Sequence, residues 1–164
     1  MAYSPGAGEP GSALYHHFKG KDALFEAVLE ALETDVGRRT VAASAGAPSA
    51  TAALRAGCLA WVRIAGDPVV QRILLIDAPS VLGWDRWRAL EERHALGLIK
   101  AALAMIASEG GLAPGLVEIF SHVLLATMNE IALFVARADD PGTAMSSATD
   151  AVEEVLSRLV GDPR

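Results

Sequence analysis

The segment SALYHHFKGKDALFEAVL, residues 12–29, gathers side chains that can bind phosphate oxygens. The Tyr15 hydroxyl, a His17 ring nitrogen and the Lys21 ammonium are all hydrogen-bond donors. Lys21 also stands at the expected start of a helix, where free backbone N–H groups and the helix dipole favour an anion. The spacing therefore indicates phosphate contacts at a turn between two helices. The alternative is that Tyr15 and His16 only pack against neighbours or face solvent.

Two other combinations of acidic and imidazole side chains suggest metal chemistry. Glu91 and His94 form an E-x-x-H pattern, and Glu118 and His122 are four residues apart. A four-helix di-iron site needs two E-x-x-H motifs and two further inward-facing Glu residues, whereas this chain has one such motif, in a charged stretch that looks exposed. No H-E-x-x-H, G-x-S-x-G, phosphate loop or dinucleotide fingerprint is present. We expect no catalytic residue, metal or cofactor; a helical-bundle enzyme is a remote alternative.

The elements that would position these groups are helices. Apolar residues recur at intervals of three and four, no run alternates like a half-buried strand, and there is no internal repeat. The expected helices are 13–18, one opening at 21 and reaching at least 36, 51–65, 69–76, 83–108, 114–138 and 143–160. The sequence therefore predicts an all-α fold.

Several local signals set the helix boundaries. Residues 40–50, TVAASAGAPSA, are small and polar and predict a linker. Asp67 followed by Pro68 is a strong start signal, an N-cap followed by proline at the first helical position. The helix that begins there is expected to stop near Pro79. Asp77 either caps that turn or pairs with Arg72.

Composition and charge exclude several classes. The 164 residues are 52% hydrophobic and carry a net charge of −6, which argues against disorder and against a surface that coats nucleic acid. There is no signal-peptide pattern, and the apolar helix 114–138 carries too many polar groups for an ordinary membrane span. The single cysteine, Cys58, fits a reducing compartment, and 11 Arg against 3 Lys suggest a GC-rich bacterial genome. We expect a cytoplasmic protein with no membrane partner.

Residues 14–24 carry the pattern L-Y-x-H-F-x-x-K-x-x-L, which resembles the end of the DNA-binding domain of TetR-type bacterial transcriptional regulators. Residues 72–103 look like a segment of the ligand domain of many such regulators, and the resemblance covers roughly residues 12–160. It implies a TetR-like helical bundle. Residues 1–39 would be a residual helix-turn-helix region, and residues 51–164 a ligand-binding and dimerisation domain.

The resemblance also implies a function and its residues. The family's regulators are homodimers whose helix-turn-helix enters the major groove, and a small molecule bound to the C-terminal domain controls their affinity for DNA. This chain would be a ligand-responsive repressor that forms a homodimer through its last two helices. The residues expected at operator DNA are Tyr15, His16, His17 and Lys21.

The family has two helices before its recognition helix, and two helices with their turns need about 30 residues. Eleven residues precede Ser12 here, and five of them are Gly or Pro. Residues 1–39 contain four basic and six acidic residues, a net charge of −2. We therefore expect a regulator that is short at its N-terminus relative to the family, with weak or no operator binding by this chain alone. The alternative function is a DNA-free small-molecule sensor or dimerisation partner.

In such a domain the effector cavity lies among the later helices, and its wall is expected to be apolar with a few polar groups, suited to a small hydrophobic or aromatic effector. The candidate lining residues are Trp61, Arg72, Trp84, Trp87, His94, Phe120, His122, Met128 and Asn129. Trp, Phe and Met at helical spacing are also ordinary core residues. Arg72 and His122 are more informative, because a buried polar side chain needs a partner.

Overall fold

The computed structural model describes residues 20–160, and every regular element in this range is helical. The predicted all-α class is confirmed. The elements are α2 (Lys21–Ser44), α3 (Ala50–Ala65), α4 (Pro68–Gln71), a π-helical turn (Arg72–Asp77), α5 (Ala78–Leu82), α6 (Trp84–Glu91), a second π-helical turn (Glu92–Leu96), α7 (Gly97–Ser108), a 3-10 turn (Pro114–Leu116), α8 (Val117–Ala136) and α9 (Pro141–Val160). The expected helix 13–18, with Tyr15, His16 and His17, lies outside the described residues.

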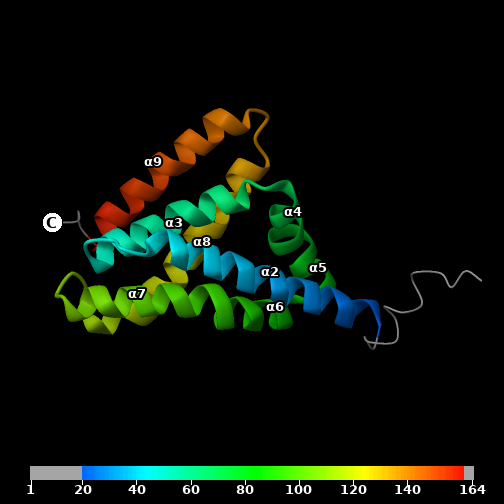
Figure 1. Cartoon of the computed structure of the whole chain (residues 1–164), viewed down its shortest axis with the longest axis horizontal. Helices are drawn as coiled ribbons and strands as arrows, with labels where there is room; N and C mark the ends of the chain where they lie inside the picture. The colour runs from blue at the N-terminus through cyan, green and yellow to red at the C-terminus, as the bar shows by residue number, and fades with distance from the viewer. Residues whose placement is uncertain (1–19, 161–164) are drawn as a thin grey trace, which may run out of the picture.

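Helix α3 is the centre of the bundle and packs against α2, α7, α8 and α9. Helices α7 and α8 also pack on each other, as do α8 and α9. Figure 1 shows α4 and α5 at the end of the bundle where α2 begins, and α5 contacts α2 there. Helix α2 therefore extends from the N-terminal part of the chain along the whole side of the bundle.

Two clusters of buried apolar side chains hold these helices together. The larger one joins α3, α7, α8 and α9 through Leu54, Cys58, Val62, Leu103, Ile106, Leu124, Met128, Val152 and Leu156. The smaller one joins α2 to the α4–α5 segment through Leu29, Val36, Ile64, Val70, Leu74, Ala78, Leu82 and Leu90. Each fully buried Leu or Val contributes about 1.5–3 kcal/mol relative to exposure. Trp61 packs against both clusters.

Side-chain caps and pairs fix the starts of α3 and α4, and the Asp67–Pro68 start signal was predicted from the sequence whereas the Ser49 cap was not. Asp67 Oδ1 accepts a 2.8 Å hydrogen bond from Val69 N, with Pro68 at the start of α4, which confirms that prediction. The Ser49 hydroxyl accepts a 3.1 Å bond from Ala52 N and caps α3. Arg72 pairs with Asp77, with 3.1 Å between Nε and Oδ2, so the pairing alternative holds rather than the cap.

Two predicted boundaries were wrong. Helix α2 runs on to Ser44, so the first part of the predicted 40–50 linker is helical and residues 45–49 make the connection. The helix that begins at Pro68 also continues through Pro79 to Leu82. The π-helical turn explains this, because Ala78 N–H donates to Ile73 O, five residues back, and the wider turn accommodates the proline that follows.

Helices α2 and α3 approach each other closely at Gly57. A Cβ atom there would lie 3.1 Å from Ser44 Oγ and 3.3 Å from Thr40 Cγ2. The Ser44 hydroxyl also donates a 2.9 Å hydrogen bond to Ala53 O, which fixes the end of α2 on α3. The absence of a side chain at Gly57 therefore sets the distance between these two helices.

By length and composition alone, one stretch in the described part of the chain, Pro114–Ala136, would suffice to cross a membrane. Leu124, Met128 and Ala132 on its α8 portion are buried in the bundle. One face of this helix is therefore packed in the bundle, while Ile119, Val123 and Phe134 on it are exposed.

Candidate functional site

A cavity of about 250 Å³ lies among α2, α3, α7 and α8. Its wall is mostly aliphatic, with Val36, Leu54 and Leu98 contributed by three different helices. Leu74 and Leu75 come from the first π-helical turn, and His94 and Ala95 come from the second. Because π-helical turns are rare and occur often at functional sites, their convergence on one cavity marks this region of the bundle.

Four of the nine residues expected at an effector cavity line this one: Trp61, His94, Met128 and Asn129. Trp61 and His94 are half-buried, and Met128 is buried. These four residues come from three separate helical segments, and their role at an effector site stays a prediction.

The other five residues do not line this cavity. Arg72 is exposed and paired with Asp77. Trp84 is 64% exposed, and its ring centroid lies 5.0 Å from that of Trp87 in a tilted contact. Trp87 packs against the smaller core. These three residues lie on the α4–α6 side of the bundle, and the expected burial of Arg72 is wrong.

Phe120 and His122 lie on faces of α8 that do not reach the cavity. Phe120 packs against the larger core. His122 Nδ1 lies 2.9 Å from an Arg88 guanidinium nitrogen, so Nδ1 is the acceptor of that bond. His122 Nε2 lies 3.5 Å from Glu118 Oε1, which shows the i,i+4 pair read from the sequence.

Two buried carboxylates, Glu33 of α2 and Glu91 of α6, line the cavity and were not among the predicted site residues. They are 7% and 5% exposed. A signal for Glu33 was present, because it stands four residues after Leu29 and three before Val36, on the buried face of its helix. Glu91 belongs to the charged stretch that was expected to be exposed, and that expectation is wrong for this residue.

The Glu91 carboxylate has different surroundings on its two oxygens. Oε1 accepts a 2.7 Å hydrogen bond from Asn129 Nδ2. Oε2 is buried and has no hydrogen-bond partner in the described part of the chain; Arg88 NH1 is 3.6 Å away. Half of this carboxylate is therefore satisfied by α8, and the other half only by a longer ion pair.

Burial changes the protonation of both groups. Desolvation raises the pKa of Glu33 from 4.5 to about 7, and the negative charges of Glu91 and Glu30 add to this effect. Desolvation also raises the pKa of Glu91, against the lowering effects of the Asn129 hydrogen bond and the Arg88 charge. The cavity thus contains one carboxyl group, that of Glu33, with a pKa of about 7, and a second, that of Glu91, with a raised pKa.

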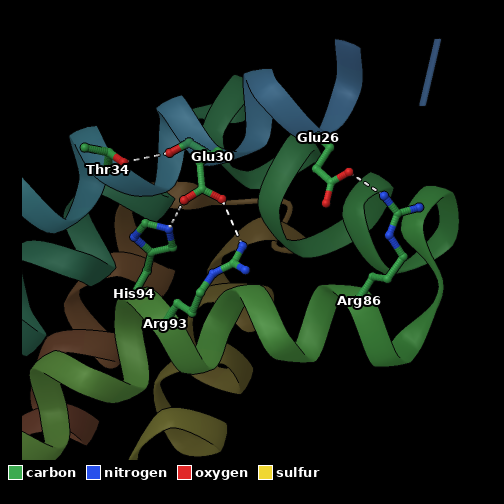
Figure 2. Close-up of polar contacts among 6 residues, drawn as sticks. All are labelled: Glu26, Glu30, Thr34, Arg86, Arg93 and His94. Carbon is green, nitrogen blue, oxygen red and sulfur yellow. Dashed lines mark hydrogen bonds and ion pairs between the residues drawn. The ribbon is translucent and has the colours of Figure 1, made fainter. Parts of the chain in front are cut away.

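A polar cluster joins α2 to the segment that carries His94. Figure 2 shows Glu30 between His94 and Arg93, with His94 Nε2 at 2.8 Å from Oε1 and Arg93 NH2 at 3.1 Å from Oε2. The hydrogen bond from His94 is the main cause of the lowered pKa of Glu30. Farther toward the N-terminus of α2, Glu26 pairs with Arg86. These side-chain contacts join α2 to α6 and to the segment that carries His94, which forms part of the cavity wall.

Of the four residues expected at DNA, only Lys21 lies in the described range. It is exposed at the first position of α2, after Gly20, whose φ of 124° is a conformation that glycine adopts readily. Its ammonium is therefore accessible at the helix N-terminus. Within residues 20–160, no group of three His, Cys, Asp or Glu side chains could hold a metal ion.

Comparison with known proteins identifies the bundle. Residues 51–159 match the family described as tetracyclin repressor-like, C-terminal domain. No curated protein matches the chain. The matched range covers α3 to nearly the end of α9, the helices that form the larger core and most of the cavity wall. The chain therefore belongs to the tetracyclin repressor-like C-terminal domain family.

Proposed function

We propose that this chain is a ligand-responsive transcriptional repressor of the TetR type, and that the cavity among α2, α3, α7 and α8 is its effector site. The observation that carries the proposal is the cavity itself. It has aliphatic walls and a few polar groups, the usual character of a small-molecule site, within a regulator-type domain. The effector is a small compound with an apolar or aromatic body. The repressor acts in the cytoplasm.

Helix α2 is the element that would transmit the effect of ligand binding from the cavity to the DNA-binding region. Six α2 residues line the cavity: Glu33, Val36, Gly37, Thr40, Val41 and Ser44. The same helix begins at Lys21, beside the segment that resembles a recognition helix. A compound that favours one position of α2 over another would shift the operator-binding equilibrium by its difference in affinity for the two.

The proposed homodimer uses α8 and α9. Four large apolar side chains are exposed on one face of α8 and the turn before it: Leu116, Ile119, Val123 and Phe134. Their intervals of 3, 4 and 11 residues place them in one stripe along the helix. A stripe of this kind is a typical association surface.

A thermal-shift screen with apolar and aromatic compounds tests the effector site. Compounds that bind the cavity are expected to raise Tm in a concentration-dependent manner, since ligands that bind only the folded state stabilise it by mass action. Fluorescence polarisation with DNA from upstream of the gene then tests the regulatory step. A hit that leaves a measured affinity for that DNA unchanged would contradict the repressor function, and ligand binding with no DNA binding at all would favour a DNA-free sensor.

A second candidate function is a DNA-free small-molecule sensor or dimerisation partner. The net charge of −2 in residues 1–39 favours it, because specific DNA binding draws much of its affinity from basic contacts to phosphate. Nanomolar, salt-sensitive and sequence-specific DNA binding by the 164-residue chain would exclude this candidate. Ligand binding without any DNA binding would favour it over the repressor.

A further inference from the structure

We propose that the cavity binds an organic monocation, a protonated amine carried on an apolar or aromatic body, with its ammonium group held by Glu33 in the field of the buried carboxylate of Glu91. This inference rests on the proposed effector site and names the chemical class of its ligand. It is carried by the two buried carboxylates, by the absence of basic residues in the cavity wall, and by the apolar remainder of that wall.

The first observation concerns Glu33. Its side chain is 7% exposed and lines the cavity, yet it has no hydrogen-bond or ion-pair partner within residues 20–160. A buried carboxylate without a partner costs several kcal/mol of desolvation, so proteins rarely keep one in an ordinary core. A cationic ligand would supply the missing partner.

The second observation concerns Glu91 of α6, which lines the same cavity and whose charge acts on Glu33. Asn129 holds the carboxylate through Oε1, which leaves the buried Oε2 without a hydrogen-bond donor among the described residues. Arg88 lies 3.6 Å from this oxygen, too far for a hydrogen bond, and does not line the cavity. Because Oε2 is fully buried, an ammonium in the cavity would bond to the carboxylate of Glu33, and the nearby charge of Glu91 would stabilise it electrostatically.

The charge of the wall determines the sign of the ligand. The described residues that line the cavity include no Arg and no Lys, and the imidazole of His94 is already bonded to Glu30 outside it. An anionic ligand would face two carboxyl groups with no counter-charge, and a neutral ligand would leave them unpaired. The aliphatic side chains and the ring of Trp61 provide an apolar surface for the body of the ligand.

Binding of the cation should release a proton. Near pH 7 the folded protein holds a proton on Glu33 in part of the population, and a bound ammonium favours the ionised carboxylate. The charged groups that act on this pair are Glu30 from α2 and Arg88 and Glu92 from the α6 side. His94 is hydrogen-bonded to Glu30. Affinity for an amine should therefore rise about tenfold between pH 6 and pH 8.

Three compounds that share a phenylbutyl body separate charge from hydrophobicity: 4-phenylbutylamine, 4-phenylbutan-1-ol and 5-phenylpentanoate. Isothermal titration calorimetry at pH 8 should show the amine binding at least tenfold more tightly than the alcohol, with no detectable binding of the carboxylate. Glu33→Gln and Glu91→Gln should each weaken amine binding tenfold or more and leave the alcohol unchanged or improved. Glu154→Gln, an exposed position on α9, is the matched control and should change neither. Circular dichroism melts confirm that each variant is folded.

The outcomes separate this inference from the proposed function. If the alcohol binds the wild-type chain as tightly as the amine, or if both Gln variants retain amine affinity, the charge assignment is overturned while the cavity remains a ligand site. If none of the three compounds binds, the monocation assignment is also overturned, and the thermal-shift screen with other compounds decides the effector site. Amine-selective binding that disappears in both Gln variants supports the inference.

Discussion

The side-chain amide of Asn129 on α8 donates a 2.7 Å hydrogen bond to Glu91 Oε1 at the end of α6, across the wall of the cavity. The bond joins two helical segments whose residues lie 38 positions apart in the chain. Glu91 is 5% exposed, so this donor replaces part of its lost hydration. The polar wall of the cavity is thus fixed between two helices, and its energetics can be measured.

Asn129→Ala is expected to lower the free energy of unfolding by about 2 kcal/mol at pH 8, because it leaves a buried charged oxygen without its donor. Urea denaturation measures this loss. The Glu91→Gln background is the control, since a neutral amide tolerates the missing donor better, and the loss there should be clearly smaller. Equal losses in the two backgrounds would show that the hydrogen bond to the charged carboxylate has no special role.

The stability of the chain should decrease with pH through the titration of Glu33. The folded state holds its proton up to about pH 7, whereas the unfolded chain releases it near 4.5, so the folded state binds more protons between these values. Stability contributed by this group should fall by about 3 kcal/mol as pH rises from 4.5 to above 7. Glu33→Gln should remove this component and be more stable than the wild-type chain at pH 8. A wild-type protein and variant with the same pH profile would contradict the burial of Glu33.

Two glycines in helix interiors should respond in opposite directions to alanine. At Gly37, a Cβ would meet Leu98 Cδ1 at 3.6 Å, an ordinary contact, so Gly37→Ala should stabilise the protein by about 0.5–1 kcal/mol. At Gly57, the contacts of 3.1 and 3.3 Å require the Ser44 and Thr40 side chains to shift, and because Ser44 Oγ is held by its bond to Ala53 O, Gly57→Ala should cost about 1 kcal/mol net. Thermal melts compare the two, and stabilisation by both would mean that the α2–α3 contact is not tight.

The association surface can be tested with charge substitutions. Val123→Glu and Phe134→Glu, on the exposed stripe of α8, should convert a dimer into a monomer at micromolar concentration, because each buries a charge in the proposed interface. Val69→Glu is the matched control, since Val69 is 63% exposed on α4 and lies outside the exposed stripe of α8. Light scattering after size exclusion measures the mass. A wild-type monomer, or dimers in all three variants, would contradict the α8–α9 interface.

Much of the fold follows from local signals in the sequence. The Asp67–Pro68 start and the apolar periodicity of α3, α7, α8 and α9 each depend on neighbours in the chain, and these predictions agree with the structure. The passage of a helix through Pro79 depends on a shift to i−5 hydrogen bonding in the preceding turn. The residue types in this turn do not indicate that shift. The general rule that proline ends a helix therefore predicted the wrong C-terminal boundary for this helical segment.

The candidate site was only partly predictable for a similar reason. The family resemblance indicated which helices surround a cavity. Four of the residues predicted on that basis line the cavity of this structure: Trp61, His94, Met128 and Asn129. Trp84, like Trp61, is a tryptophan at a position of the apolar helical spacing, yet it is 64% exposed. The burial of Glu33 and Glu91 results from packing among helices distant in sequence. Charge normally indicates a solvated face, so composition favoured the wrong interpretation there.

The most direct test of the account is whether a bulky side chain in the cavity wall abolishes ligand binding. Ala101 and Ala104 are both exposed alanines on α7, but only Ala101 lines the cavity. Isothermal titration of a compound that stabilises the wild-type chain should show at least a tenfold loss of affinity in Ala101→Trp and wild-type affinity in Ala104→Trp. Equal affinity in the two variants would contradict the assignment of this cavity as the effector site.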